Sequence, residues 1–488
     1  MQESILKIVQ TLNGYLADYI LIILLIGTGL WFSFKTKFVQ VRCFKEGMKS
    51  VFGNFSLRGG KQQGGLSSFQ ALATAIAAQV GTGNIVGASG AILLGGPGAI
   101  FWMWIIAFLG MATIYAEATL AQETRVIDEN GEVHGGPVYY MKKAFPNGFG
   151  TFLSVFFAIA ITLALGFMGS MVQSNSIAGA MEKVIDPNKA SILFSIGGID
   201  VTVTAAVVGA IVAILAAFIF LGGIQRIASV TEKLVPIMAG LFLLGGLAVI
   251  IIRIKYIPET IGMIFKYAFV PQALIGGGIG AALKIAISQG AKRGLFSNEA
   301  GMGSTPHAHA QANVEKPHDQ GVVAMIGVFI DTFVVLTMTA LVVISCLYAG
   351  DGILAESIAN GTYVEAISGD AALVSKATAM QEAMMHAFPM LGNFGAIFVA
   401  ACLLFFAFST ILSWNFFGKI NVQYLTKNSK IATTLYSIIA IAFIFFGALL
   451  SNDLVWELTD FFNYLMVLPN VIALIALWKI VAKNANNK

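Results

Sequence analysis

The stretch AAQVGTGNIVG, residues 77–87, places polar backbone rather than a reactive side chain at the centre of an apolar segment. A helix that breaks at Gly81, Thr82 and Gly83 exposes their amides at the start of its second half. A helix N-terminus carries partial positive charge and attracts anions. These three residues are therefore predicted to bind a carboxylate.

Carbonyl oxygens and hydroxyls near the same break favour a cation. The first half-helix would end in free carbonyls at Ala77 and Val80, which suit a hard ion. Ser409 and Thr410 add two hydroxyls in the apolar segment FFAFSTILSWNFFG. Taken alone, both hydroxyls are better explained by bonds to their own helix. Beside a broken helix with spare carbonyls, they are predicted sodium ligands.

Glu117 and Asp331 are the clearest ionisable residues inside apolar segments, where such groups are functional by default. An equal alternative is that each pairs with Lys or Arg near a helix end. His307 and His309, two residues apart, do not share a helix face and have no Cys or acidic partner for zinc. Their segment, residues 293–310, is expected to form a cytosolic gate or hairpin. The chain also lacks a nucleotide-binding P-loop, which argues against ATP as the energy source.

The elements that position these residues must be membrane helices. The chain has 488 residues, of which 57% are hydrophobic and 11% charged, against about 25% charged in soluble domains. Its three cysteines lie too far apart in sequence for a disulfide framework. Eleven segments reach the length of about 20 residues that a spanning helix needs. They lie near 17–34, 67–96, 98–122, 150–180, 201–223, 232–253, 259–290, 320–349, 391–418, 431–450 and 457–481.

Most of the 29 Lys and Arg residues fall on one side of this arrangement. Lysine and arginine accumulate on the cytoplasmic side of membrane proteins. This distribution predicts an outside N-terminus and a cytosolic C-terminus.

Ten helices remain after the first one, and they divide as five and five. The opening helix of the first group carries the break at Gly81–Gly83. The opening helix of the second carries LIGGGIG, with Gly276, Gly277 and Gly278. One Gly cluster alone would indicate close helix packing. Two at matching positions favour an inverted-repeat transporter with discontinuous first and sixth core helices. The expected divisions are residues 1–65 for the extra helix and basic loop, 66–256 for the first repeat and 257–488 for the second.

Three motifs resemble blocks of the alanine/glycine:cation symporter family, also called the sodium:alanine symporter family. They are GGPGAIFWMWIIAFLG at residues 95–110, GTGNIVG, and GLFSNEAGMGSTPHAHA. The resemblance spans nearly the whole chain. It implies an all-α, leucine-transporter-type fold of two inverted five-helix repeats with one extra helix in front. It also implies sodium-driven uptake of small neutral amino acids.

The resemblance also implies roles for individual residues. For the substrate these are Gln79, Gly81, Thr82, Gly83, Phe167, Ser170, Gln173 and Trp414, with the Gly276–Gly278 break opposite. For sodium they are Ala77, Val80, Ser409 and Thr410, and more weakly Asn84.

Two positions depart from the family pattern. Family members often carry Asn where Ser170 stands and an aromatic residue where Gly278 stands. Both differences remove volume from the expected pocket wall. They predict a wider pocket that admits glutamine as well as alanine or glycine.

The sequence thus predicts a secondary transporter in a bacterial-type plasma membrane, with Na⁺ as the co-transported ion and no enzymatic activity. Its expected partners are a small neutral amino acid, sodium and the lipid bilayer, without nucleic acid or an obligate protein partner. A proton-coupled carrier is the main alternative, which Glu117 and Asp331 keep open. A passive channel would not need two broken helices, and a membrane enzyme would need a nucleophile–base pair.

Overall fold

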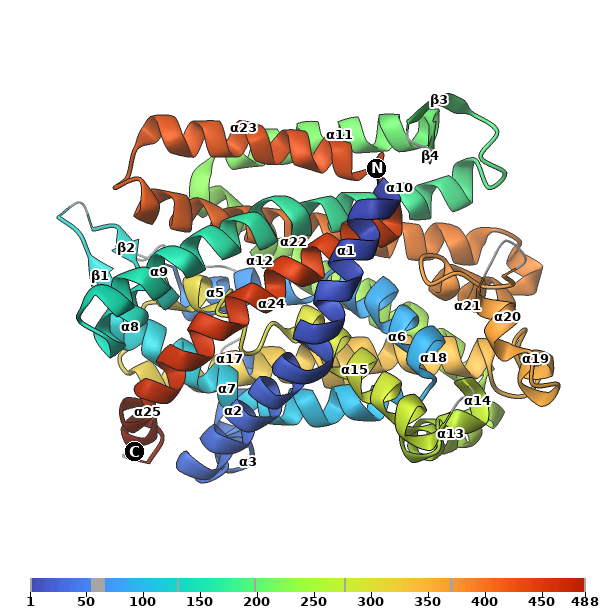
Figure 1. Ribbon diagram of the computed structural model, residues 1–488, viewed down its shortest axis with the longest axis horizontal. Coiled ribbons are helices and arrows are strands. Elements are labelled where there is room, and N and C mark those ends of the chain that lie inside the picture. The colour runs from blue at the N-terminus through green and yellow to red at the C-terminus, as the bar shows by residue number, and fades with distance from the viewer. Residues whose placement is uncertain are drawn as a thin grey trace.

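The computed structural model describes residues 2–53, 66–129, 131–196, 199–275, 278–368 and 372–486, and these are almost entirely helical. Figure 1 shows long helices packed side by side, with α11 and α23 along one edge and α2 and α7 along the opposite edge.

The first half begins with α1 (Gln2–Tyr15), a π-helical segment (Leu16–Leu21), α2 (Ile22–Lys35), α3 (Val39–Arg42), α4 (Phe44–Phe52), α5 (Ser68–Gln79), a second π-helical segment (Gly83–Gly87) and α6 (Ala88–Gly95). It continues with α7 (Ala99–Thr124), β1 (Val126–Ile127), β2 (Val133–His134), α8 (Pro137–Ala144), α9 (Gly148–Ile161), a π-helical segment (Thr162–Gly169), α10 (Ser170–Ile185), β3 (Ile192–Ile196), β4 (Ile199–Thr202), α11 (Val203–Phe220) and α12 (Gly223–Ile252). The strands form two antiparallel pairs, β1 with β2 and β3 with β4.

The second half begins with a 3₁₀ turn (Ile254–Tyr256), α13 (Ile257–Phe269), α14 (Gln272–Ile275), α15 (Ile279–Asn298), α16 (Pro306–Ala310), α17 (Pro317–Val328), a π-helical segment (Phe329–Leu336) and α18 (Thr337–Leu347). It ends with α19 (Ala355–Ala359), α20 (Tyr363–Ile367), α21 (Ala379–Ala387), a 3₁₀ turn (Pro389–Leu391), α22 (Phe394–Leu425), α23 (Lys430–Gly447), α24 (Asn452–Ala476) and α25 (Trp478–Asn486).

The membrane-protein prediction is confirmed. Among the described residues, nine helices are long and apolar enough to cross a membrane, and the bent pair Ser68–Gln79 and Gly83–Gly95 makes ten. That pair bends by 46° at the expected break. The orientation of the termini and the division into residues 1–65, 66–256 and 257–488 stay predictions.

The sequence predicts one spanning helix over residues 259–290, but the structure has several helices there. The segment contains α13, α14 and the start of α15, which continues to Asn298. The apolar pattern of the sequence predicts an earlier end for this helix, because the charged residues Lys284 and Lys292 interrupt the pattern. Both lysines form ion pairs with Asp18 of the first helix, at 3.2 and 3.1 Å. One carboxylate of the N-terminal helix thereby contacts two lysines of α15 and offsets one of their two positive charges.

Local sequence sets several of the helix ends. Ser67 and Gln70 form a reciprocal capping box at the start of α5, which satisfies two backbone amides there. Asn147, Thr202 and Ser429 accept backbone hydrogen bonds at the starts of α9, α11 and α23. The capping box therefore sets the start of α5, the helix that precedes the first break, at Ser68.

Glycine lets α15 approach α7 closely. A Cβ on Gly290 would lie 2.7 Å from the Trp102 Cβ and 2.8 Å from the Ala99 carbonyl oxygen. One turn later, a Cβ on Gly294 would have its nearest neighbours at 3.8 Å, an ordinary contact distance. Only the first glycine is therefore required by packing.

We expect Gly290→Ala to lower the thermal unfolding midpoint in detergent, because overpacking costs roughly 1–3 kcal/mol. The matched control, Gly294→Ala, should keep or raise the midpoint, because alanine favours a helix by about 1 kcal/mol over glycine. Equal midpoints for the two variants would contradict the close α7–α15 contact.

Candidate functional site

The first break exposes backbone groups in the protein interior. α5 ends at Gln79, Val80 leaves the helical conformation with φ −82° and ψ 86°, and helix resumes at Gly83. All the side chains from Ala71 to Leu93 are buried. The free amides at the break therefore need protein partners, because lipid offers none.

Two side chains supply those partners. The Gly81 amide donates to Asn84 Oδ1 at 3.0 Å, and the Thr82 amide donates to Gln173 Oε1 at 3.1 Å. Gln173 comes from α10, so a distant helix closes the break. Its carboxamide oxygen stands where a carboxylate oxygen of a ligand would accept the same bond. The amides of Gly81 and Thr82, which were predicted to bind an anion, are thus both held by neutral carboxamide oxygens.

Two polar groups at this point remain unsatisfied. Thr82 Oγ1 and Gln173 Nε2 are buried and have no hydrogen-bond partner among the residues that the structure describes. Buried polar groups without partners are uncommon and usually mark a missing ligand or water. The break therefore has unused hydrogen-bonding capacity beside the Thr82 amide.

Two of the expected cation ligands, Thr410 and Ala77, are in contact on the other side of the break. Thr410 Oγ1 donates to the Ala77 carbonyl at 2.8 Å and also lies 3.0 Å from the Phe406 carbonyl. A Cβ on Gly81 would lie 2.4 Å from Thr410 Oγ1 and 3.2 Å from Gln173 Oε1. Gly81 thus separates the Thr410 hydroxyl from the Gln173 carboxamide, and only glycine fits there.

Ser409 forms a hydrogen bond within its own helix, which is the alternative to a role as a sodium ligand. Its hydroxyl donates to the Phe406 carbonyl of its own helix at 2.9 Å and lies 3.4 Å from Met238 Sδ. A cation ligand role for Ser409 would require its hydroxyl to turn away from these atoms.

A further helix break, distinct from the expected one at LIGGGIG, lies at residues 299–305 and is called the second break below. Glu299, Gly301 and Gly303 have positive φ angles of 58°, 96° and 78°, and α16 begins only at Pro306. Glycine tolerates such angles without strain. The Gln79 side chain donates to the Asn298 carbonyl at 2.8 Å, so the two breaks are in direct contact.

The structure does not bring Gly278 to this cluster. Gly278 precedes α15, and a helix of 20 residues separates it from the second break by about 30 Å. It is exposed and has no heavy atom within 4 Å of an added Cβ. Gly276 and Gly277 lie outside the described residues. The expectation of a wider pocket therefore depends on Ser170 alone.

Glu117 stabilises the second break. Its carboxylate accepts from the amides of Gly301 and Gly303 at 3.1 and 2.9 Å and from Asn470 Nδ2 at 2.6 Å. Because all three partner groups are hydrogen-bond donors, both carboxylate oxygens of Glu117 act as acceptors. Within the described chain no Lys or Arg forms an ion pair with it, which contradicts the helix-end alternative.

Asp331 connects the two breaks. It accepts from Asn84 Nδ2 at 2.6 Å, from Ser297 Oγ at 2.9 Å and from Thr332 Oγ1 at 2.8 Å. Asn84 belongs to the first break, and Ser297 lies just before the second. Asp331 is fully buried, and its bonds are to neutral groups. The helix-end alternative is therefore wrong for this residue too.

Trp414 and Glu299 form one edge of the cluster. The Trp414 indole N–H donates to Glu299 Oε1 at 2.5 Å, and Ser304 Oγ donates to Glu299 Oε2 at 2.5 Å. The centroid of the Trp414 ring lies 5.7 Å from that of the Phe296 ring. Phe296 in turn packs on the first break, because a Cβ added to Gly83 would lie 2.9 Å from the Phe296 ring. Trp414 thus lies beside the first break.

Phe167 and Ser170 are placed differently. The Phe167 ring packs against Tyr436 and Phe443, at centroid distances of 5.4 and 4.9 Å, and not against the break. Ser170 is fully buried, and its hydroxyl donates to the Leu165 carbonyl at 3.2 Å. Of the three α9–α10 candidates, only Gln173 contacts the break directly.

The two histidines, expected on a cytosolic gate or hairpin, are buried in the structure, and the role of a gate stays a prediction. His307 is buried, stacks on Phe417 at 5.6 Å and contacts Asn421 at 2.8 Å. His309 is buried beside Gln320, at 2.8 Å. They support the short helix that follows the second break.

Sequence reasoning missed Glu299 as a site residue. The signal was present in SNEAGMGST, where two glycines and a carboxylate interrupt an apolar pattern as GTGN does at residues 81–84.

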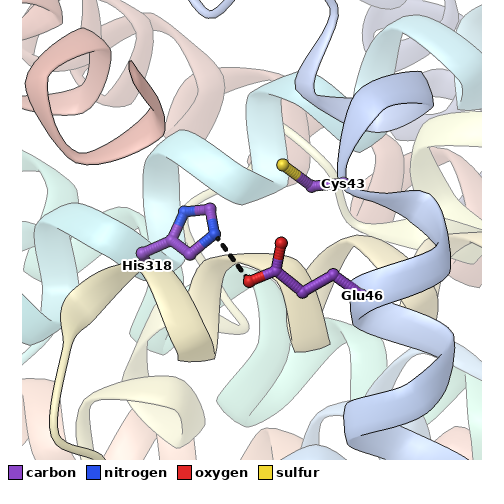
Figure 2. A group of neighbouring side chains, drawn as sticks. All are labelled: Cys43, Glu46 and His318. Atoms are coloured by element: carbon purple, nitrogen blue, oxygen red, sulfur yellow. Dashed lines mark hydrogen bonds and ion pairs between the residues drawn. The ribbon is translucent and has the colours of Figure 1, made fainter. Parts of the chain in front are cut away.

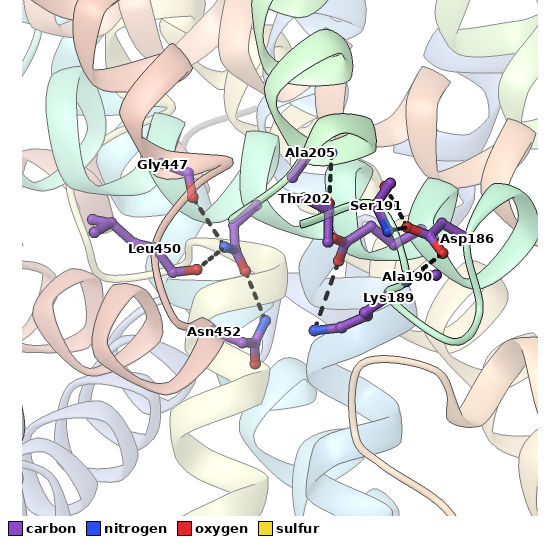
Figure 3. Close-up of polar contacts among 11 residues, drawn as sticks. Asp186, Lys189, Ala190, Ser191, Thr202, Ala205, Gly447, Leu450 and Asn452 are labelled. Carbon is purple, nitrogen blue, oxygen red and sulfur yellow. Dashed lines mark hydrogen bonds and ion pairs between the residues drawn. The ribbon is translucent and has the colours of Figure 1, made fainter. Parts of the chain in front are cut away.

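A cavity of about 580 Å³ lies between the end of α10 and residues 448–452, next to β3 and β4, and is lined by both polar and apolar residues. Asn175 donates to the carbonyls of Gly447 and Leu450 at 2.9 and 2.8 Å and accepts from Asn452 at 3.0 Å (Figure 3). Asn175 follows Gln173 by two residues on α10. The cavity wall therefore comes within one helical turn of the residue that occupies the Thr82 amide.

Glu117→Gln provides a test of the carboxylate's role. One of its atoms would become an N–H group facing a backbone N–H, and a buried unsatisfied donor costs about 1–3 kcal/mol. We expect a lower unfolding midpoint in detergent. Glu123→Gln is the control, since Glu123 lies exposed on the same helix and its oxygen would still accept from Asn484. Equal midpoints would contradict the arrangement of three donors.

Comparisons with known proteins agree with this architecture. The model of the sodium:alanine symporter family matches residues 2–487. The sodium/alanine symporter AgcS of Methanococcus maripaludis is 39% identical over 96% of this chain and 94% of its own length. The probable sodium/glutamine symporter GlnT of Bacillus subtilis is 36% identical over 99% of this chain and 90% of its own length.

A solved structure shares the fold. The crystal structure of MhsT in complex with L-phenylalanine superposes with a TM-score of 0.57 at 16% identity, covering 87% of this chain and all of that one. Identity at that level supports the fold alone. Taken with the whole-length family match, these findings show that the chain is a membrane transporter of the sodium:alanine symporter family.

Proposed function

We propose that the protein imports small neutral amino acids together with sodium. The observation that carries the proposal is the contact of Thr410 Oγ1 with the Ala77 carbonyl at 2.8 Å, directly behind the amides of the first break. A cation site and an anion site then share one short stretch of backbone. A zwitterionic amino acid and a sodium ion are ligands that fit this pair.

The substrate carboxylate is proposed to accept from the Thr82 amide in place of Gln173. Gln173 Oε1 already marks a suitable acceptor position at 3.1 Å, and the unsatisfied Thr82 hydroxyl can add a second donor. Amides at a helix start stabilise a negative charge. Gly81, Thr82 and Gly83 remain the proposed carboxylate ligands, with Gln79 and Trp414 beside them.

Sodium is proposed to bind between the carbonyls of Ala77 and Val80 and the hydroxyl of Thr410. Because Thr410 Oγ1 also lies 3.0 Å from the Phe406 carbonyl, its hydrogen can turn there while a lone pair faces the ion. Ser409 and Asn84 are the further proposed ligands. Each ligand orders the same break, so binding of one lowers the cost of binding the other.

Alanine and glycine are the proposed default substrates, and glutamine is a serious candidate. The names of the relatives AgcS and GlnT refer to alanine and to glutamine. Uptake of radiolabelled alanine, glycine and glutamine into proteoliposomes, with an imposed sodium gradient, tests the proposal. Full uptake driven by a proton gradient without sodium would favour the proton-coupled alternative, in which buried Glu117 or Asp331 would carry the proton.

Thr410→Ala should raise the sodium concentration for half-maximal uptake about tenfold or more. A bond from a neutral group to a charged one contributes roughly 1.5–3 kcal/mol, and 1.4 kcal/mol corresponds to tenfold. Thr434→Ala is the control, because that exposed hydroxyl donates only to Lys430 of its own helix. An unchanged sodium dependence in Thr410→Ala would remove Thr410 from the ion site.

Alaninamide should compete poorly with labelled alanine. It keeps the ammonium group and the methyl side chain but lacks the carboxylate that the first break is proposed to bind. We expect its inhibition constant to exceed that of unlabelled alanine by at least about tenfold. Comparable inhibition by both compounds would exclude the amides of Gly81–Gly83 as carboxylate ligands.

A further inference from the structure

A thiol, an imidazole and a carboxylate converge at a point outside the transport site. Cys43 directly precedes α4, Glu46 lies in its first turn, and His318 lies in the first turn of α17. Their ligand atoms all lie within 4.8 Å of one another. Figure 2 shows the sulfur and the carboxylate directed toward the imidazole ring.

We propose that Cys43, Glu46 and His318 bind a zinc ion that fastens α4 to the helix bundle. Thiolate, imidazole and carboxylate are the three side chains that zinc prefers. Together a thiolate and a carboxylate carry two negative charges, which neutralise a divalent ion. Three protein ligands leave a fourth tetrahedral position for water.

The spacing of two ligands already suits zinc. His318 Nε2 lies 3.2 Å from Glu46 Oε1. Two ligands bound at 2.0–2.1 Å to a tetrahedral ion lie roughly 3.3 Å apart. The sulfur needs to approach by at most about 1 Å, which a rotation about its Cα–Cβ bond can supply.

A second interaction orients the imidazole. The Tyr115 hydroxyl, from α7, lies 2.7 Å from His318 Nδ1. Histidines that bind metals usually place their other ring nitrogen on such a partner, which fixes the ring orientation. In this structure Nδ1 is engaged by Tyr115, and Nε2 is the atom that faces Glu46. Tyr115 is thus a positioning residue for the site.

The backbone around the site is held rigidly. A Cβ on Gly47 would lie 2.8 Å from the Val322 carbonyl oxygen, so α4 packs directly on α17. Cys43 is fully buried, whereas the Glu46 side chain is 37% exposed, which gives an ion a path from solvent. The ligands therefore come from elements that are already fixed relative to one another.

The other candidate cluster fits zinc less well. Asp128, Glu132 and His134 gather on the β1–β2 hairpin, where Glu132 is exposed and no thiol contributes. A spectroscopic signal that requires a metal–sulfur bond therefore distinguishes binding at Cys43 from binding at the β1–β2 hairpin.

Cobalt(II) is the probe for the test, because it replaces zinc and gives a charge-transfer band in the near ultraviolet only when a thiolate binds it. The full-length protein, purified in detergent with a histidine-free affinity tag, is titrated with cobalt under reducing conditions. We expect a band that saturates at one cobalt per chain and disappears when zinc is added. The absence of this band in the wild-type protein would overturn the proposal.

Variants locate the site. Cys43→Ala should abolish the band while leaving the Tyr115–His318–Glu46 hydrogen bonds intact, so the protein should still fold. Cys402→Ala, which removes another buried thiol, should leave the band unchanged. Tyr115→Phe should weaken cobalt binding about 10–100-fold, the usual effect of losing such a partner. A band that persists in Cys43→Ala, or disappears in Cys402→Ala, would overturn the assignment.

Zinc should also raise the thermal unfolding midpoint of the wild-type protein, because a ligand that binds only the folded state stabilises it. The same zinc concentration should leave the midpoint of Cys43→Ala unchanged. An equal rise in both proteins would place the stabilising metal elsewhere.

Discussion

Backbone amides and carbonyls without helical partners must be satisfied by other protein groups when they lie at membrane depth. This constraint governs the centre of the molecule, where α5 and α15 both end in the interior. The Thr82 amide is satisfied by Gln173, the amides of Gly301 and Gly303 by Glu117, and the Asn298 carbonyl by Gln79. Each of these polar side chains comes from another part of the chain. The hydrogen bonds to the backbone of the breaks thus hold the surrounding helices in position.

The same contacts couple the two breaks. Asp331 accepts from Asn84 beside the first break and from Ser297 before the second, and Gln79 bonds across from one to the other. A change in backbone conformation at one break therefore alters the hydrogen bonds of the other. A transporter needs this kind of connection, because ligands that bind at one place must change which face of the protein is open. Buried hydrogen bonds to carboxylates are strong enough to transmit such a change without ion pairs.

Ligand binding and structural stability use the same groups here. Gln173 stabilises the Thr82 amide, yet it occupies the position that we assign to a substrate oxygen. The hydrogen bond that a substrate forms is therefore offset by the one it displaces, which limits affinity and allows release. Thr410 acts in the same way on the cation side, where its bond to Ala77 is the contact that sodium would replace. The zinc site proposed at α4 is built from other elements, since its ligands come from the start of α4 and the start of α17.

The sequence by itself determined the class of protein, the first break and several of the residues that meet there. Composition and apolar segment length depend only on local residues, and a Gly-Thr-Gly interruption in an apolar helix has few explanations. The Thr410–Ala77 contact followed because both partners stood out as polar groups in apolar segments. The sequence did not determine where the second helix breaks, since LIGGGIG and NEAGMGS both contain the glycines that a break requires. Only the tertiary structure showed that NEAGMGS lies beside the first break, because a buried break needs partners, and Glu117, Asn470 and Gln79 converge on Gly301, Gly303 and Asn298. The partners of Glu117 and Asp331 likewise lie far away in sequence, and hydrogen bonds between distant segments leave no periodic pattern that a single sequence can reveal.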